Sequence, residues 1–344
     1  MPCRKAWHFF YAVTEFFFCE KRELIVKNNT FAQKFHFMPK GTVIKSTGSH
    51  YVVRDEQGLS VECRVKGRMR LDNIKSTNPV AVGDYVEFAV EDGEGVIAEL
   101  LPRRNYVVRR STNLSKQTHV LAANVDQALL VVTVNYPITT TTFIDRFLAS
   151  AEAFGVPVVI VFNKIDRYDE PQQAELDALK KIYSDMGYSV CEVSAKNNEG
   201  LETVKQHLKD KISVIAGHSG VGKSTLINRI EPTLNLRTDD ISEANNSGKH
   251  TTTNAEMHKF SFGGYVIDTP GIRGFGITNI EKEEISHYFR DIFKISDECQ
   301  FCNCTHTHEP GCAVKNAVRE GVLPASRYQS YLNIMSDDDS KYRY

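Results

Sequence analysis

One glycine-rich segment has the residue types and spacing of a phosphate-binding loop. It reads Gly217-His218-Ser219-Gly220-Val221-Gly222-Lys223-Ser224-Thr225, which matches G-x-x-x-x-G-K-S. Residues 211–217 read as a buried strand and residues 223–230 as a helix, the context that such a loop needs. Backbone N–H groups and the helix N-terminus would hold phosphate oxygens, Lys223 would reach the β- and γ-phosphates, and Ser224 would ligate Mg²⁺. The alternative is a glycine-rich turn without a ligand.

Two segments upstream of this loop carry residues that would select a guanine base. Asn163-Lys164-Ile165-Asp166 follows an apolar run and has the pattern N-K-x-D. The Asp166 carboxylate would accept hydrogen bonds from guanine N1–H and the N2 amino group, which adenine cannot offer. Asn163 would brace the loop, and the Lys164 stem would cover the base. Ser194-Ala195-Lys196 ends the next expected strand, where the Ala195 N–H could bind guanine O6.

Two further segments have the residues of nucleotide-sensing switches. In Asp268-Thr269-Pro270-Gly271, Asp268 would hold Mg²⁺ through water and the Gly271 N–H would sense the γ-phosphate. A threonine in Lys249-His250-Thr251-Thr252-Thr253 could ligate Mg²⁺ only while the γ-phosphate is present. We favour Thr252, although spacing does not separate it well from its two threonine neighbours.

The residue after the second switch motif predicts slow intrinsic hydrolysis. Many GTPases place a water-orienting Gln there, but this chain has Ile272, which cannot hydrogen-bond to water. We therefore expect a partner to accelerate the reaction. His250 is the candidate to position the water; the alternative is that it only packs within the switch.

The five nucleotide motifs occur in a rotated order. Ordinary GTPases run from the phosphate-binding loop through the switch threonine and D-x-x-G to N-K-x-D and S-A-K. Here N-K-x-D and S-A-K come first. A cyclic shift of this kind preserves a sheet, because termini at the surface can be relocated. The motifs therefore predict a circularly permuted GTPase domain.

A second kind of chemistry is indicated near the C-terminus. Four of the eight cysteines lie within residues 299–312, together with His306 and His308. Structural zinc needs four such ligands, commonly Cys₃His or Cys₂His₂. Because the other cysteines are scattered, we expect a metal site in a reducing compartment rather than a disulfide framework.

The totals are those of an ordinary globular protein. The chain has 344 residues, a net charge of −1 and 41% hydrophobic residues, which is enough for two or three domains. No run of 18 apolar residues occurs, so we expect no membrane partner and a cytoplasmic protein. Residues 1–37 are rich in aromatic residues without a sustained period, and we interpret them as a non-core extension outside the natural translated product. A signal peptide is the alternative, but His8 and Glu15 interrupt its apolar patch.

The elements that must position these motifs can be read from turn signals and periodicity. Five short strands in the first part predict an OB-type barrel, at residues 42–46, 50–54, 60–66, 84–90 and 95–101. Alternating strands and helices then predict a parallel sheet covered on both faces. Its strands are expected at 127–134, 157–162, 189–193, 213–216, 257–262 and 265–267, and its helices at 142–154, 171–186, 200–209 and 223–230. Two more helices, 282–293 and 313–321, would flank the cysteines.

Basic and aromatic side chains in several places could contact nucleic acid. In the barrel they are Tyr51, Arg54, Lys66, Arg68 and Arg70. The stretch between Glu99 and Asp126 has no acidic residue but carries Arg103, Arg104, Arg109, Arg110, Lys116 and His119. Near the C-terminus they are Lys315, Arg319 and Arg327. The alternatives are a barrel that only packs on its neighbour and a solvated linker.

Taken with the linker sequence Arg109-Arg110-Ser111-Thr112, these motifs resemble the circularly permuted GTPases of small-ribosomal-subunit biogenesis, the RsgA (YjeQ) family. The resemblance runs from Met38 to about Gln329. It implies an α/β fold with four parts: an extension (1–37), an OB-fold barrel (38–104), a circularly permuted GTPase domain (105–280) and a zinc-binding C-terminal domain (281–344). The family's metal pattern falls on Cys299, Cys304, His306 and Cys312, which leaves Cys302 and His308 surplus.

The resemblance also implies a function. Family members of this kind are Mg²⁺-dependent GTPases that convert GTP to GDP and phosphate. The resemblance therefore implies one structural Zn²⁺ in this protein, and Mg²⁺ held through Ser224, Thr252 and Asp268. Its partners would be the small ribosomal subunit, its rRNA and other assembly factors, and we expect a monomer. Two alternatives belong to other classes: a nucleotide-gated RNA-binding scaffold without significant turnover, and a P-loop kinase, which N-K-x-D disfavours.

Replacing His250 with Ala is expected to leave GTP binding intact and to reduce the hydrolysis that the small subunit stimulates. The physical reason is that the imidazole would orient the attacking water without contributing to nucleotide affinity. Phosphate release with and without purified subunits measures this. Unchanged stimulated hydrolysis in the variant would exclude the role.

Overall fold

The computed structural model describes residues 38–65, 79–91, 93–110, 118–236, 255–268 and 281–336. Several predicted residues lie outside these ranges, namely residues 1–37, Lys66, Arg68, Arg70, Ser111, Thr112, Lys116, Lys249, His250, Thr251, Thr252, Thr253, Gly271, Ile272 and the tail from residue 337. In the described part of the chain, no helix is both long and apolar enough to cross a membrane.

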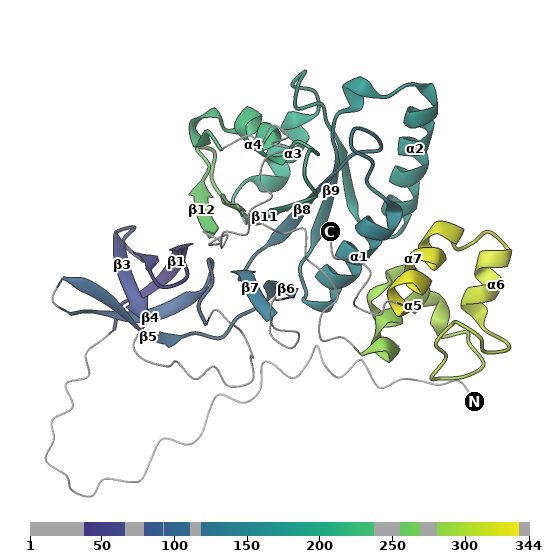
Figure 1. Cartoon of the computed structure of the whole chain (residues 1–344), viewed down its shortest axis with the longest axis horizontal. Helices are drawn as coiled ribbons and strands as arrows, with labels where there is room; N and C mark the ends of the chain where they lie inside the picture. The colour runs from purple at the N-terminus through teal and green to yellow at the C-terminus, as the bar shows by residue number, and fades with distance from the viewer. Residues whose placement is uncertain are drawn as a thin grey trace, which may run out of the picture.

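The first five strands close into a small barrel, as the sequence predicts (Figure 1). They are β1 (Lys40–Ser46), β2 (Tyr51–Asp55), β3 (Ser60–Val65), β4 (Tyr85–Glu91) and β5 (Glu94–Leu100). β1 pairs with both β2 and β4, and β3 runs parallel to β5, which completes the ring. Alternate apolar residues such as Val43, Val53 and Phe88 point into one buried core.

Two residues expected to contact nucleic acid are instead part of this barrel's structure. The Tyr51 side chain lies in the barrel core, with only 2% of the residue exposed. The Arg103 side chain is 5% exposed and makes a two-point ion pair with Asp84, at 2.7 Å from each carboxylate oxygen. Arg104 pairs with Asp126 at 2.7 Å. Ion pairs within the protein therefore neutralise part of the basic stretch. The prediction of a nucleic-acid contact is wrong for Tyr51 in the barrel core, and the prediction of a phosphate contact is wrong for Arg103.

A β-hairpin follows the barrel where the sequence suggested only a linker. β6 (Tyr106–Arg110) pairs antiparallel with β7 (Thr118–Ala123). Val107 and Val108 of β6 and Val120 and Leu121 of β7 are all buried. The β-branched residues Val107, Val108 and Val120 are the sequence signal for these two strands, which were not predicted.

A mainly parallel sheet forms the centre of the molecule (Figure 1). Its order is β10-β9-β8-β11-β13-β12, and β12 alone is antiparallel to its neighbour within this group. The strands are β8 (Gln127–Val132), β9 (Val158–Phe162), β10 (Ser189–Glu192), β11 (Ile212–Ala216), β12 (Ala255–Lys259) and β13 (Tyr265–Asp268). Their carboxyl ends carry the predicted nucleotide motifs, so the sheet brings motifs from distant parts of the chain to one edge.

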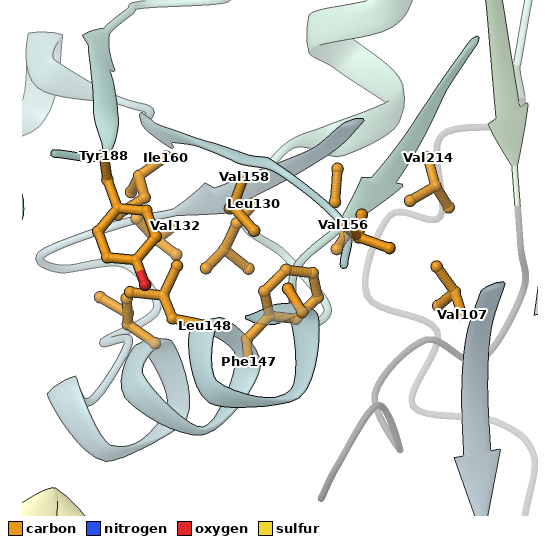
Figure 2. Close-up of a cluster of buried hydrophobic side chains, with 14 of the residues drawn as sticks. Val107, Leu130, Val132, Phe147, Leu148, Val156, Val158, Ile160, Tyr188 and Val214 are labelled. Atoms are coloured by element: carbon orange, nitrogen blue, oxygen red, sulfur yellow. The ribbon is translucent and has the colours of Figure 1, made fainter. Parts of the chain in front are cut away.

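Helices cover both faces of this sheet. They are α1 (Thr141–Ala153), α2 (Glu170–Asp185), α3 (Leu201–Leu208) and α4 (Lys223–Ile230). Figure 2 shows Phe147 and Leu148 of α1 packed against Leu130 and Val132 of β8. The intervening strand residues, Leu129 and Val131, face α3 and α4 in a second buried cluster. Continuous apolar runs are what a strand buried on both faces requires.

Local signals explain where the first two helices begin. The Thr140 hydroxyl accepts a hydrogen bond from the Phe143 N–H and so caps α1. Asp169 and Gln172 form a reciprocal capping box at the start of α2, with a proline in its first turn. Such caps satisfy N–H groups that have no partner within the helix.

The barrel and the central sheet share one hydrogen-bonded sheet. β1 pairs antiparallel with β12 through Lys45 opposite Glu256 and Ser46 opposite Ala255. A 3.0 Å ion pair joins Lys45 to Glu256. Arg54, another predicted nucleic-acid contact, lies over the Tyr265 ring of β13, 5.7 Å from its centroid.

The C-terminal part is a helical unit that packs beside α1 (Figure 1). It contains a 3₁₀ helix, η4 (Lys282–Tyr288), followed by α5 (Arg290–Ser296), α6 (Ala313–Arg319) and α7 (Ala325–Ser336). The expected single helix at 282–293 breaks at Phe289, whose backbone is extended and whose ring is fully buried edge-on to Tyr331. α7 was not predicted, although Tyr328, Tyr331 and Ile334 have helical spacing after a proline.

Arg327 is the buried centre of the contact between α7 and α1. The residue is 2% exposed. Its guanidinium donates to Asp145 of α1 at 2.6 Å and to both carboxylate oxygens of Asp291 at 3.0 Å. Burial opposes the charge, but the two carboxylates outweigh it and raise the pKa of Arg327. The prediction that Arg327 contacts RNA is therefore wrong, because no part of its charge reaches the surface.

Replacing Arg327 with Met is expected to destabilise the packing of α7 on α1 by about 3–5 kcal/mol, because Asp145 would remain buried without its cation. Hydrogen exchange of the α7 amides measures this local stability. The matched control is Arg319→Met on the exposed surface of α6, which should change exchange little. Equal protection of α7 in both variants would contradict the assignment.

Candidate nucleotide site and metal cluster

The phosphate-binding loop joins β11 to α4 in the conformation that its glycines allow. Gly217 has φ +135° and Gly222 has φ +93°. A Cβ atom at Gly217 would lie 2.2 Å from Val131 O, and one at Gly222 would lie 2.5 Å from Asn163 Nδ2. Both positions therefore require glycine, for backbone geometry as well as for space.

The lysine of this loop turns back over the loop itself. Lys223 begins α4, and its Nζ donates to Gly217 O at 2.8 Å and to His218 O at 2.9 Å. The ammonium group is thus held over the loop that would receive phosphate oxygens. Ser224 is half-buried in the first turn of α4, and Thr225 is exposed beside it.

Asn163 connects the base-recognition segments to the phosphate-binding loop. Its Nδ2 donates to Val221 O at 2.8 Å, and its Oδ1 accepts from the Ala195 N–H at 3.1 Å. The side chain is buried and makes a hydrogen bond with each of its two polar atoms. The Ala195 N–H, expected to face guanine O6, is therefore engaged within the protein in this structure.

Asp166 and Lys164 are oriented by specific contacts. Asp166 Oδ1 accepts a 2.6 Å hydrogen bond from Ser194 Oγ, which itself accepts from the Asn197 N–H. Lys164 has φ +66°, and its Nζ donates to Gly220 O at 2.6 Å and to Tyr136 O at 2.7 Å. Burial, followed by the charge of Arg167, lowers the pKa of Lys164. The base segments and the phosphate loop are thus connected by hydrogen bonds, and the partly buried Ile165 packs against the hydrophobic core.

The remaining predicted nucleotide residues are only partly described. Asp268 is the last residue of β13, and β13 lies directly beside β11, which leads into the phosphate-binding loop. Asp268 therefore ends one of two adjacent parallel strands, and Ser224 lies in the helix that follows the other. Oxygen donors in this position suit Mg²⁺. Thr252, His250 and Gly271 lie outside the described residues. Lys196 lies in the turn that follows β10, and its side chain is exposed.

Four of the six soft ligands near the C-terminus lie together. Cys299, Cys304, His306 and Cys312 place one ligand atom each within 4.8 Å of all the others. A tetrahedral zinc site separates sulfur ligands by about 3.8 Å, so this Cys₃His group is compatible with zinc. Within the described residues the group does not include Cys302 or His308. The structure thus assembles the four residues that the resemblance implied.

Neighbouring side chains hold the loop that carries His306. The Glu309 carboxylate accepts hydrogen bonds from the Thr305 N–H at 2.8 Å and the Thr307 N–H at 3.1 Å. From α7, the Tyr328 hydroxyl donates to His306 O at 2.7 Å and the Tyr331 hydroxyl to Thr305 O at 2.6 Å. Support of this kind around the ligands fixes the geometry of a metal site.

Two family models match this chain. The RsgA GTPase model matches residues 100–278, and the RsgA N-terminal domain model matches residues 40–97. Curated relatives named small ribosomal subunit biogenesis GTPase RsgA are 54% identical in Phocaeicola vulgatus and 55% in Bacteroides thetaiotaomicron, where the protein is numbered RsgA 2. Each alignment covers 88% of this chain and 99% of the relative.

Solved structures of similar proteins agree with the fold. The crystal structure of YjeQ from Thermotoga maritima is 41% identical, with a TM-score of 0.71 over 86% of this chain and 97% of that one. The structure of YloQ, described as a circularly permuted GTPase, is 35% identical, with a TM-score of 0.67 over 91% of this chain and 99% of that one. The rotated order of the motifs is thus shared with a known fold.

Removing metal with a strong chelator is expected to unfold the loop between α5 and α6 and to loosen α7, because Tyr328 and Tyr331 would lose their carbonyl partners. Metal content by mass spectrometry and helical circular dichroism measure the two effects. The expected stoichiometry is one zinc per chain, and Cys312→Ser should lose it. Full zinc content in that variant would contradict the ligand set, whereas Cys191→Ser in β10 serves as the matched cysteine control.

Proposed function

Because this chain belongs to the RsgA GTPase family, we propose that it hydrolyses GTP to GDP and phosphate while assisting late maturation of the small ribosomal subunit. The observation that carries this proposal is the buried Asn163 side chain, which joins the base-recognition segments to the phosphate-binding loop. Guanine recognition and phosphate binding would then act on one molecule. The permuted order of the motifs does not change this arrangement.

Guanine selection would rest on Asp166. Its carboxylate is held by Ser194, so its orientation is fixed before a base arrives. Two hydrogen bonds from guanine N1–H and the N2 amino group fit a carboxylate, and adenine lacks that pair. The Lys164 stem would cover one face of the base. Lys196 and the backbone of Ala195 would border the site on the S-A-K side.

Phosphate binding would use the backbone of residues 217–222 and the Lys223 ammonium group. Lys223 would exchange its two carbonyl partners for phosphate oxygens when the nucleotide enters. Ser224, Thr252 and Asp268 would hold Mg²⁺, whose chemistry is to neutralise charge on the β- and γ-phosphates. The Gly271 N–H would sense the γ-phosphate, and His250 would position the attacking water.

Ribosomal RNA would be met by the barrel and by the C-terminal helical unit. With Tyr51, Arg103 and Arg327 committed to the protein interior, the remaining basic candidates include Lys315 and the exposed Arg319 on α6. One zinc ion in the Cys₃His group would stabilise this unit. We further propose that the protein acts as a monomer in the cytoplasm and meets other assembly factors on the subunit.

GTP turnover with and without purified small subunits tests the function. We expect slow multiple turnover alone and a large acceleration by subunits, because Ile272 stands at the position where many GTPases have a water-orienting Gln. The alternative is a nucleotide-gated RNA-binding scaffold, which would bind GTP and subunits without releasing phosphate beyond one equivalent. That result would overturn the enzymatic proposal.

Replacing Asp166 with Asn is expected to reduce GTP affinity by about 100-fold or more, because two hydrogen-bond acceptors are replaced by one acceptor and a donor facing guanine N–H groups. Xanthosine triphosphate, which presents a carbonyl in place of the amino group, should bind the variant better than GTP does. Competition binding measures both nucleotides. The control is Asp177→Asn on the exposed side of α2, and an unchanged preference for GTP in Asp166→Asn would contradict the role.

A further inference from the structure

The His218 side chain connects the phosphate-binding loop to the loop between β8 and α1. Its Nε2 atom lies 2.7 Å from Thr139 Oγ1. Its ring meets the Phe143 ring edge-on, with 5.5 Å between centroids. Thr139 is buried, although it lies 79 residues away in the sequence. A residue that the pattern treats as variable therefore has a defined partner.

The donors and acceptors along this connection form a consistent chain. Thr139 Oγ1 accepts a hydrogen bond from the Thr133 N–H at 3.1 Å, so its own proton is available for His218 Nε2. His218 Nδ1 lies 3.1 Å from Ser219 O, and a carbonyl oxygen can only accept. One neutral tautomer, with the proton on Nδ1, satisfies both contacts. The chain thus runs from the end of β8 through Thr139 and His218 to the Ser219 carbonyl.

These hydrogen bonds fix the orientation of one peptide group of the phosphate-binding loop. In a trans peptide the carbonyl and the following N–H point in opposite directions. Because the Ser219 carbonyl faces the imidazole, the Gly220 N–H points away from it. The next peptide group is fixed as well, since Gly220 O accepts from Lys164 Nζ at 2.6 Å. Gly220, with φ +81°, is thus held on one side by His218 of the same loop and on the other side by Lys164 of the N-K-x-D segment.

We propose that His218, held by Thr139, is a positioning residue for nucleotide phosphates: it sets the Ser219–Gly220 peptide so that the Gly220 N–H is ready to donate to a β- or γ-phosphate oxygen. This inference rests on the proposed GTPase function and deepens it. A donor that is already oriented costs no reorganisation when the nucleotide binds. The connection should therefore favour nucleotides with two or three phosphates over GMP.

Three substitutions separate the hydrogen bonds from the bulk of the side chain. Thr139→Val keeps the shape and removes the hydroxyl, and His218→Leu keeps most of the bulk without a donor or acceptor. His218→Gln offers a carbonyl oxygen to Thr139 and an N–H to Ser219 O, so it can restore the chain. Thr142→Val is the matched control, because its hydroxyl contacts Asn333 of α7 rather than the phosphate-binding loop.

Fluorescence titration of the full-length protein with GDP, GTP and GMP tests the proposal. We expect Thr139→Val and His218→Leu each to weaken GDP and GTP binding about tenfold, because both remove the hydrogen bond between Thr139 and His218, while GMP affinity stays unchanged. The double variant should be no weaker than either single variant, and His218→Gln should bind within about threefold of the wild type.

Three results would overturn the inference. They are wild-type affinities in both Thr139→Val and His218→Leu, a His218→Gln variant as weak as His218→Leu, and an equal loss of GMP affinity, which would indicate general unfolding. Thr139→Val keeps the test decisive if His218→Leu does not fold. Failure of the wild-type protein to bind GTP would instead reject the proposed function itself, so the two failures are distinguishable.

Discussion

The side-chain amide of Asn163 is the interaction on which the nucleotide site depends. A buried amide with an unpaired donor or acceptor costs about 1–3 kcal/mol, and here Val221 O and the Ala195 N–H provide the partners. The approach is so close that a side chain at Gly222 would collide with Nδ2. The close contact therefore requires both Gly222 and Asn163, and it holds the phosphate-binding loop and the S-A-K segment in place together. Because these contacts depend on proximity at the sheet edge, a change in chain order leaves them intact.

The sequence predicted the parts of the fold that follow from local patterns. The five barrel strands and the alternating strands and helices of the GTPase domain were found within a few residues, because burial on one face or two gives distinct apolar patterns. The glycines at 217 and 222 were recognisable because their backbone conformation excludes other residues. The phosphate-binding motif and N-K-x-D are each a continuous stretch of sequence, so the chemistry of each could be predicted without knowing the fold.

The errors concern residues whose partners are distant in the chain. Arg327 and Asp145 are 182 residues apart, and nothing near Arg327 in the sequence indicates that its charge is neutralised inside the protein. Arg103 was read as a surface charge for the same reason, although Asp84 lies only 19 residues before it. The break at Phe289 also depends on a distant residue, since its ring packs against Tyr331. A basic residue in a polar stretch looks the same whether it faces RNA or a buried carboxylate.

The pairing of β1 with β12 means that the barrel covers the edge strand of the central sheet, which would otherwise be exposed. An open edge strand offers unpaired N–H and C=O groups to any other chain, which is a common origin of aggregation. The first residues of β12, Ala255 and Glu256, are covered by Ser46 and Lys45 of the barrel. A GTPase domain cut free at residue 105 would expose that edge, and β12 directly follows the switch threonines in the sequence. The two units are separate in sequence, but hydrogen bonding by the barrel protects the edge of the GTPase sheet from pairing with other chains.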